Sequence, residues 1–120
     1  MSFEISRTYR FEAAHWLPNV AVDHPCRQLH GHSYEVEIIL AGDLEPRLGW
    51  VLDFSAIDAA LEPVVAILDH ACLNELEGLE NPTSELLARW IWERAEPSLP
   101  ALWEVSVRET MSSRASYRPG

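Results

Sequence analysis

The chain has 120 residues, of which 48% are hydrophobic and 23% are charged, the proportions of an ordinary globular protein with one hydrophobic core. Its formal net charge of −10 argues against binding to nucleic acid or to an anionic membrane, because both need clustered positive charge. All 9 basic residues are arginines. Without the amine of a lysine, Schiff-base chemistry is excluded, and any carbon–carbon cleavage would need a metal as its electron sink.

The composition also indicates where the protein works. No apolar run approaches the roughly 18 residues needed to cross a bilayer. The first residues lack the basic and then apolar pattern of a secretion signal. We therefore expect one cytoplasmic domain covering residues 1–120, with Cys26 and Cys72 as free thiols. Cys72 lies among apolar residues and is expected to be a small core residue.

The first third of the chain predicts two strands. Residues 3–14 alternate between apolar and polar side chains, and His15 continues the apolar face. Residues 17–28 contain two prolines and are expected to form a loop that brings Cys26 back towards the first strand. Residues 33–41 alternate again and predict the second strand.

Two helices are expected next. The first should begin near Ser55 with Asp58 as its capping partner, and Pro63 should kink it or break its hydrogen-bond ladder locally. After a polar connection, Thr83 or Ser84 should cap the second helix.

Residues 103–109 and 115–117 predict two further strands joined by a short turn. The order β-β-α-α-β-β indicates an α+β domain, in which an antiparallel sheet is covered by two helices on one face. Unpaired sheet edges would favour self-association. Trp90, Trp92 and Trp103 are expected in the core or at a subunit interface.

Three histidines form a candidate metal site. His30 and His32 are two apart, so they project from the same face of a strand, and His15 ends the strand expected beside them. Three histidines with one open position are typical of a catalytic zinc. His24 could also be a ligand, although its place in the loop before Pro25 favours an exposed residue.

Cys26 has two possible roles. It could be a fourth ligand that closes a structural zinc site. Alternatively it could be a general base, because a thiolate is favoured beside a metal ion. We favour the general base, since a chain of this length needs no metal to hold its fold.

Three more residues are candidates for chemistry. Asp69 precedes His70, and a carboxylate next to a histidine can fix its tautomer and raise its basicity. Glu109 ends an apolar strand face, where it could accept two hydrogen bonds from an amidine-like edge of a substrate or simply be exposed.

Several separate motifs follow one another along the chain: Phe11–His15, Cys26–His32, Gly49-Trp50, Asp53-Phe54, Leu68–His70, Glu80–Glu85 and Glu109-Thr110. Taken in this order, they resemble the 6-pyruvoyl-tetrahydropterin synthase family over essentially the whole chain. The three residues between Cys26 and His30 resemble its queuosine-pathway branch, because the pyruvoyl-forming branch typically has a longer gap.

The resemblance implies a tunnelling fold (T-fold) that assembles into a ring, with two stacked trimers forming a hexamer and active sites at subunit interfaces. It implies conversion of 7,8-dihydroneopterin triphosphate to 6-carboxy-5,6,7,8-tetrahydropterin, acetaldehyde and triphosphate. The alternative is the sister reaction, which eliminates triphosphate and stops at the pyruvoyl product. A non-catalytic zinc-stabilised module is the rival from another class.

The resemblance also implies roles for individual residues. Zinc would be held by His15, His30 and His32. Cys26 would accept a proton, and Asp69, His70 and Glu109 would form a relay in which Glu109 also grips the pterin. Thr83, Ser84 and Glu85 would contact the pterin. Arg10, Arg27 and Arg114 are candidates for binding the triphosphate, and the sequence does not rank them.

Overall fold

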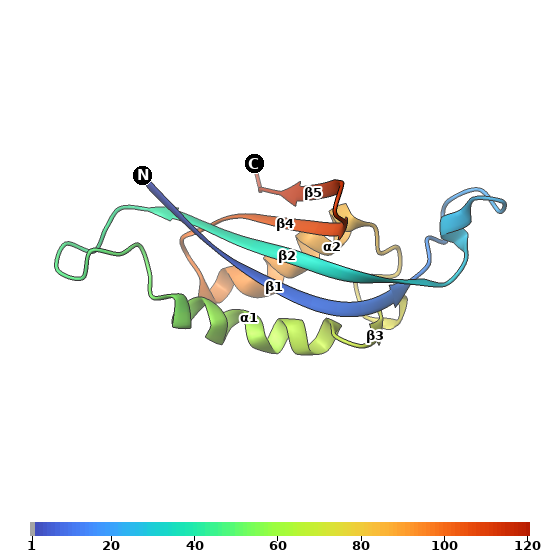
Figure 1. Cartoon of the computed structure of the whole chain (residues 1–120), viewed down its shortest axis with the longest axis horizontal. Helices are drawn as coiled ribbons and strands as arrows, with labels where there is room; N and C mark the ends of the chain where they lie inside the picture. The colour runs from blue at the N-terminus through green and yellow to red at the C-terminus, as the bar shows by residue number, and fades with distance from the viewer. Residues whose placement is uncertain (1) are drawn as a thin grey trace.

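A computed structural model describes residues 2–120. A single five-stranded sheet runs along the molecule (Figure 1). It contains β1 (Phe3–His15), β2 (His30–Gly42), β3 (Ala71–Cys72), β4 (Leu102–Thr110) and β5 (Ser113–Tyr117), in the spatial order β3-β1-β2-β4-β5.

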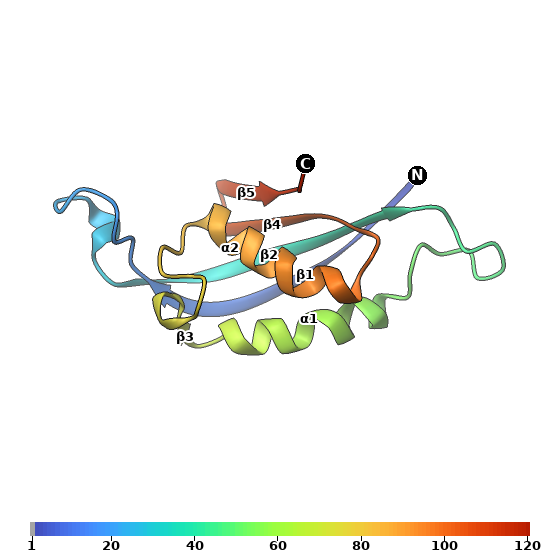
Figure 2. The same cartoon turned by 180° about the vertical axis from the view of Figure 1, so that it is seen from behind.

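Two helices, α1 (Phe54–Leu68) and α2 (Ser84–Ala95), lie on one side of this sheet, as the reverse view in Figure 2 shows. Three short 3-10 helices complete the chain at Pro25–Arg27, Leu73–Glu75 and Glu96–Ser98. The α+β architecture is therefore confirmed. No helix of residues 2–120 is both long and apolar enough to cross a membrane.

The short strand β3 was not expected, and it makes the sheet mixed. It pairs parallel to β1 through Ala13–Ala71 and Ala14–Cys72, whereas the other neighbouring strands pair antiparallel. The expectation of a wholly antiparallel sheet is wrong at this edge, because two residues are too few to show an alternating pattern. Cys72 lies in β3 and is half-buried.

The helix caps agree only in part with expectation. The N-cap of α1 is Asp53, whose side chain accepts a hydrogen bond from the Ser55 amide at 2.9 Å. The expected capping partner Asp58 is instead paired with Arg7. The helix continues through Pro63 to Leu68. For α2 the prediction is confirmed, because Thr83 caps the helix by accepting from the Leu86 amide at 3.2 Å.

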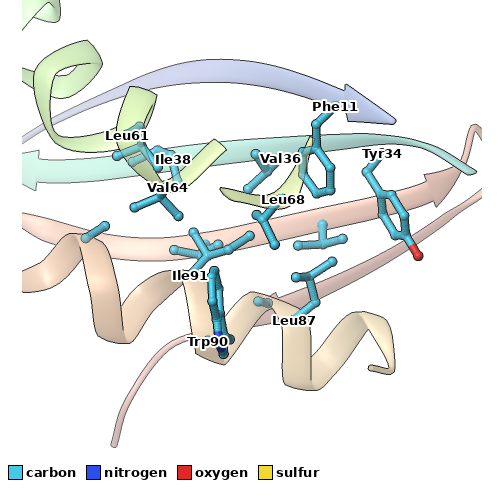
Figure 3. Packing of buried hydrophobic residues seen from close by; sticks show 14 of the residues in the cluster. Phe11, Tyr34, Val36, Ile38, Leu61, Val64, Leu68, Leu87, Trp90 and Ile91 are labelled. Carbon is cyan, nitrogen blue, oxygen red and sulfur yellow. The ribbon is translucent and has the colours of Figure 1, made fainter. Parts of the chain in front are cut away.

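The core lies between the sheet and the two helices (Figure 3). The stacked rings of Phe11 and Tyr34, 5.1 Å apart, continue this core towards the end of the sheet. Trp90 is buried, Trp92 packs against the core, and Trp103 is 41% exposed. The core thus anchors the strands up to the point where β1 ends and β2 begins.

Candidate active site

Three histidines converge where β1 ends and β2 begins. The antiparallel register sets His15 opposite His30 and Ala13 opposite His32, so all three imidazoles lie on the face that carries the core. Their ring centroids are 4.6 to 5.1 Å apart. One nitrogen from each ring lies within 4.8 Å of the others. The predicted grouping is confirmed, and it could hold a metal ion.

Backbone carbonyls orient two of these rings. The Nδ1 of His15 lies 2.8 Å from the Pro82 carbonyl oxygen, and the Nδ1 of His30 lies 2.7 Å from that of Gln28. A carbonyl oxygen can only accept, so each Nδ1 carries the proton, which leaves Nε2 with a free lone pair. This is the supporting hydrogen bond that metal-binding histidines usually make.

The electrostatics also suit a metal ligand set. Burial is the main cause that lowers the pKa of both His15 and His32, so their neutral forms, which can coordinate, are favoured. The Nε2 atoms of both residues are buried and have no hydrogen-bond partner among residues 2–120. A metal ion could accept the lone pairs of these nitrogens, so the three histidines fit a metal site.

Glu109, near the end of β4, places its carboxylate beside the histidines. Its oxygens lie 3.7 Å from the Nε2 of His32 and 4.0 Å from that of His15. The side chain is 25% exposed, so a ligand can reach it. Tyr34 lies next to it, and burial, followed by the charge of Glu109, raises the pKa of the Tyr34 phenol well above its ordinary value.

Asp69 and His70 follow α1 and are tied to β1. Asp69 accepts from the Glu12 amide at 3.0 Å, and the Nδ1 of His70 lies 3.1 Å from the same carboxylate. The hydrogen bond from Glu12, and then His70, hold the pKa of Asp69 below its usual value.

The backbone of His70 has a φ of 60°, a conformation that is uncommon outside glycine. Its amide donates to the Glu12 carbonyl, which holds this conformation in place.

A groove passes the Asp69–His70 pair and Glu109. Its lining includes Asp69, His70 and Glu109 from the predicted set, together with Tyr34 and Arg108, which sequence reasoning did not select. An adjoining groove is lined by both His32 and His70. Tyr34 could have been found from its spacing, because it continues the same strand face as His30 and His32.

Cys26 is not part of this grouping within one chain. It lies in the 3-10 helix Pro25–Arg27, where its carbonyl accepts from the Leu17 amide at 2.8 Å and its amide donates to the Nδ1 of His24 at 3.0 Å. Among residues 2–120, the group of converging ligand atoms contains the three histidines and not the Cys26 thiol.

The other predicted contacts are spread over the molecule. Thr83, Ser84 and Glu85 form the start of α2, directly after the carbonyl that holds His15. Arg10 lines the groove and pairs with Glu35 at 3.0 Å.

The other two candidate arginines lie elsewhere. Arg27 donates to the Val20 carbonyl at 2.9 Å, and Arg114 is exposed on β5.

Comparison with known proteins gives consistent matches. Residues 4–120 match the family model described as 6-pyruvoyl tetrahydropterin synthase. A Synechocystis protein named 6-carboxy-5,6,7,8-tetrahydropterin synthase is 43% identical, covering 94% of this chain and 91% of the relative. A Bacillus subtilis protein of the same name is 32% identical, covering 98% and 86%. The solved structure of Caenorhabditis elegans 6-pyruvoyl tetrahydropterin synthase superposes with a TM-score of 0.91 at 24% identity, covering 98% of this chain and 96% of that one.

Proposed function

Because the chain belongs to the 6-pyruvoyl tetrahydropterin synthase family, we propose that it converts 7,8-dihydroneopterin triphosphate to 6-carboxy-5,6,7,8-tetrahydropterin, acetaldehyde and triphosphate. The observation that carries the proposal is the three-histidine cluster facing Glu109, in a chain whose relatives include two proteins named 6-carboxy-5,6,7,8-tetrahydropterin synthase. The reaction would be a carbon–carbon lyase step of queuosine biosynthesis in the cytoplasm.

Zinc is the metal that we assign to His15, His30 and His32, since three imidazoles and an open position suit it. When bound, it would supply Lewis-acid polarisation of the hydroxyl groups on the substrate's side chain. The absence of lysine supports this assignment, because the chain has no lysine ε-amine with which to activate a carbonyl.

The chain's own residues would bind the pterin and move protons. The Glu109 carboxylate would accept hydrogen bonds from the amino-pyrimidine edge of the pterin. His70, oriented by Asp69, would exchange a proton with the substrate carbon on one face. Cys26 would do so on the other face, and Thr83, Ser84 and Glu85 would contact the pterin.

The position of Cys26 is relevant to how the protein assembles into an oligomer. Its thiol lies outside the converging group of the same chain, which supports a site completed by a neighbouring protomer. We propose a homohexamer of two stacked trimers, formed by extension of the sheets.

Product analysis tests the reaction. Zinc-loaded protein is incubated with 7,8-dihydroneopterin triphosphate, and acetaldehyde and the pterin product are followed by mass. Acetaldehyde with a carboxypterin supports the proposal, whereas triphosphate release with a pyruvoyl product would assign the chain the sister activity. The second candidate is kept because the family model that matches residues 4–120 is described by the name of that activity.

Cys26→Ala separates the enzyme from a zinc-stabilised module. We expect the variant to keep its zinc and lose turnover, because the thiol lies outside the ligand group of residues 2–120. A loss of zinc affinity, together with unfolding on chelation, would instead make Cys26 a structural ligand.

A further inference from the structure

We infer that the buried Tyr34 hydroxyl is a substrate-binding group, which donates a hydrogen bond to an acceptor atom of the heterocycle held by Glu109. This inference rests on the proposed function. It assigns a role to a residue that the sequence patterns did not select.

The first observation is an unsatisfied hydroxyl. Tyr34 is 1% exposed, yet its oxygen has no hydrogen-bond partner among residues 2–120. Within that range only three buried side-chain atoms lack a partner, and the other two are the Nε2 atoms of His15 and His32. A buried polar group without a partner is destabilising, so such groups usually have a partner or a function.

The second observation is where these atoms lie. Tyr34 follows His32 on the same strand face, with ring centroids 5.4 Å apart, and its ring is 5.9 Å from that of His15. Glu35 pairs with Arg108, so the preceding residue, Tyr34, lies beside Glu109 on the core face of the sheet.

The ring of Tyr34 is held in place by Phe11, which stacks against it. In Figure 3 its hydroxyl lies at the edge of the hydrophobic cluster and points away from the labelled apolar side chains. A fixed ring whose buried hydroxyl lies at the edge of the apolar cluster is a prearranged hydrogen-bond donor.

Tyr9 shows what a purely structural tyrosine looks like in this chain. Its hydroxyl donates to the Asp58 carboxylate, which joins β1 to α1. If Tyr34 served packing alone, phenylalanine would fill the same space without the unsatisfied oxygen. The contrast between the two tyrosines favours a ligand as the partner of Tyr34.

The chemistry of the two neighbours is complementary. The Glu109 carboxylate can only accept hydrogen bonds, so it selects the N–H groups of a heterocycle. The Tyr34 phenol can donate one, so it suits a ring nitrogen or carbonyl oxygen of the same heterocycle. Together they would recognise both the hydrogen-bond donors and an acceptor of one planar ligand.

The test is Tyr34→Phe, with Tyr9→Phe as its matched control. Neopterin, which lacks the triphosphate, is the binding probe, and zinc content and the melting temperature without ligand are measured in parallel. We expect Tyr34→Phe to keep its zinc, to melt no lower than the wild type, and to bind neopterin roughly 3- to 10-fold more weakly, as for one neutral hydrogen bond. In turnover, KM should rise while kcat changes little.

Tyr9→Phe should show the reverse pattern. It loses a satisfied hydrogen bond far from the histidines, so it should melt at a lower temperature and bind neopterin as the wild type does.

The results distinguish this inference from the proposed function. If wild-type protein turns over the triphosphate and Tyr34→Phe binds neopterin equally well, the inference alone fails. Lower thermal stability of ligand-free Tyr34→Phe, or loss of its zinc, also overturns it, because the hydroxyl would then have a structural partner. If wild-type protein neither binds neopterin nor reacts, both fail together.

Discussion

The three histidines are positioned by backbone pairing rather than by one another. His15 and His30 face each other across the ladder, and a backbone carbonyl supports each of their Nδ1 atoms. Replacing one imidazole should therefore leave the strands paired and remove one of three ligands. A substitution of one histidine should therefore affect metal binding without unfolding the chain.

We expect His32→Ala to lose its bound zinc on dialysis while keeping its fold. The loss of affinity should exceed the roughly 10- to 100-fold that follows removal of a supporting hydrogen bond. His24→Ala is the control, since the Nδ1 of His24 accepts from the Cys26 amide in the loop. Metal content measured after dialysis checks the prediction, and full zinc in His32→Ala would contradict it.

Glu109→Gln keeps the size of the side chain and removes its charge. The carboxylate lies 3.7 Å from the Nε2 of His32, beyond hydrogen-bond distance, so zinc should remain. Pterin binding should weaken by roughly 10- to 100-fold, because a hydrogen bond to a charged group contributes more than a neutral one.

Neopterin titration with a zinc assay checks the Glu109→Gln prediction. Glu104→Gln is the control on the same strand, where the carboxylate pairs with Arg118. Unchanged neopterin affinity in Glu109→Gln would remove Glu109 from the binding site.

At the scale of elements, the start of α1 offers a test between sequence and structure. The sequence placed the helix start near Ser55, whereas the structure caps it with Asp53. Asp53→Ala should lower the free energy of unfolding by about 1 kcal/mol, because it leaves the Ser55 amide in the first turn without its partner. Ser55→Ala should change it much less. Urea unfolding measures the free energy of unfolding of both variants. An equal loss in Asp53→Ala and Ser55→Ala would contradict Asp53 as the cap.

The contact between β1 and α1 should depend on pH. The Tyr9 hydroxyl, and then Arg7, hold the pKa of Asp58 below its usual value. A lowered pKa in the folded state adds stability that is present above the unfolded value of about 3.9 and is lost as the pH falls through the folded value.

We therefore expect Asp58→Asn to be less stable than the wild type at neutral pH, with a smaller further loss of stability below pH of about 4. Thermal unfolding across that range measures it. Asp23→Asn, on the exposed loop, is the control and should follow the wild-type profile. If the stability of Asp58→Asn and of the wild type fell equally as the pH was lowered, the contacts of Asp58 with Tyr9 and Arg7 would not contribute to stability.

The sequence predicted the elements whose patterns are long. Alternation over β1 and β2 located both strands, and the spacing of His30 and His32 located the metal cluster. The strand β3 has two residues, too short for any period, so its parallel pairing emerges only from tertiary contacts.

The site residues divide in a similar way. Asp69 and His70 were selected because adjacent residue types suggested chemistry. Arg108 was missed because a lone arginine on a strand carries no motif, and Tyr34 because alternating aromatics usually indicate a core. Its unsatisfied hydroxyl appears only once its surroundings are known. The separation of Cys26 from the cluster is likewise a property of the fold.

The folded chain is more elongated than a compact domain of the same number of residues. Its principal extents are 57 × 24 × 24 Å and its radius of gyration is 15.5 Å, against about 14 Å for a compact domain of this length. Within residues 2–120, most of β1 pairs on one side only, and β5 forms the opposite edge of the sheet. Long unpaired edges favour sheet extension between copies.

A pair of proline variants in β5 tests assembly through this edge. Successive amides of a strand point to opposite sides, so of Ala115 and Ser116 one amide faces β4 and the other faces outward. Proline removes the amide hydrogen. One variant should therefore keep the stability of the single chain and lose association, while the other should lower stability by breaking the β4–β5 ladder.

Sedimentation velocity, which measures association, and thermal unfolding, which measures stability, distinguish the two variants. If both variants associate as the wild type does, the assembly does not use β5, and the active site would have to be completed through another surface.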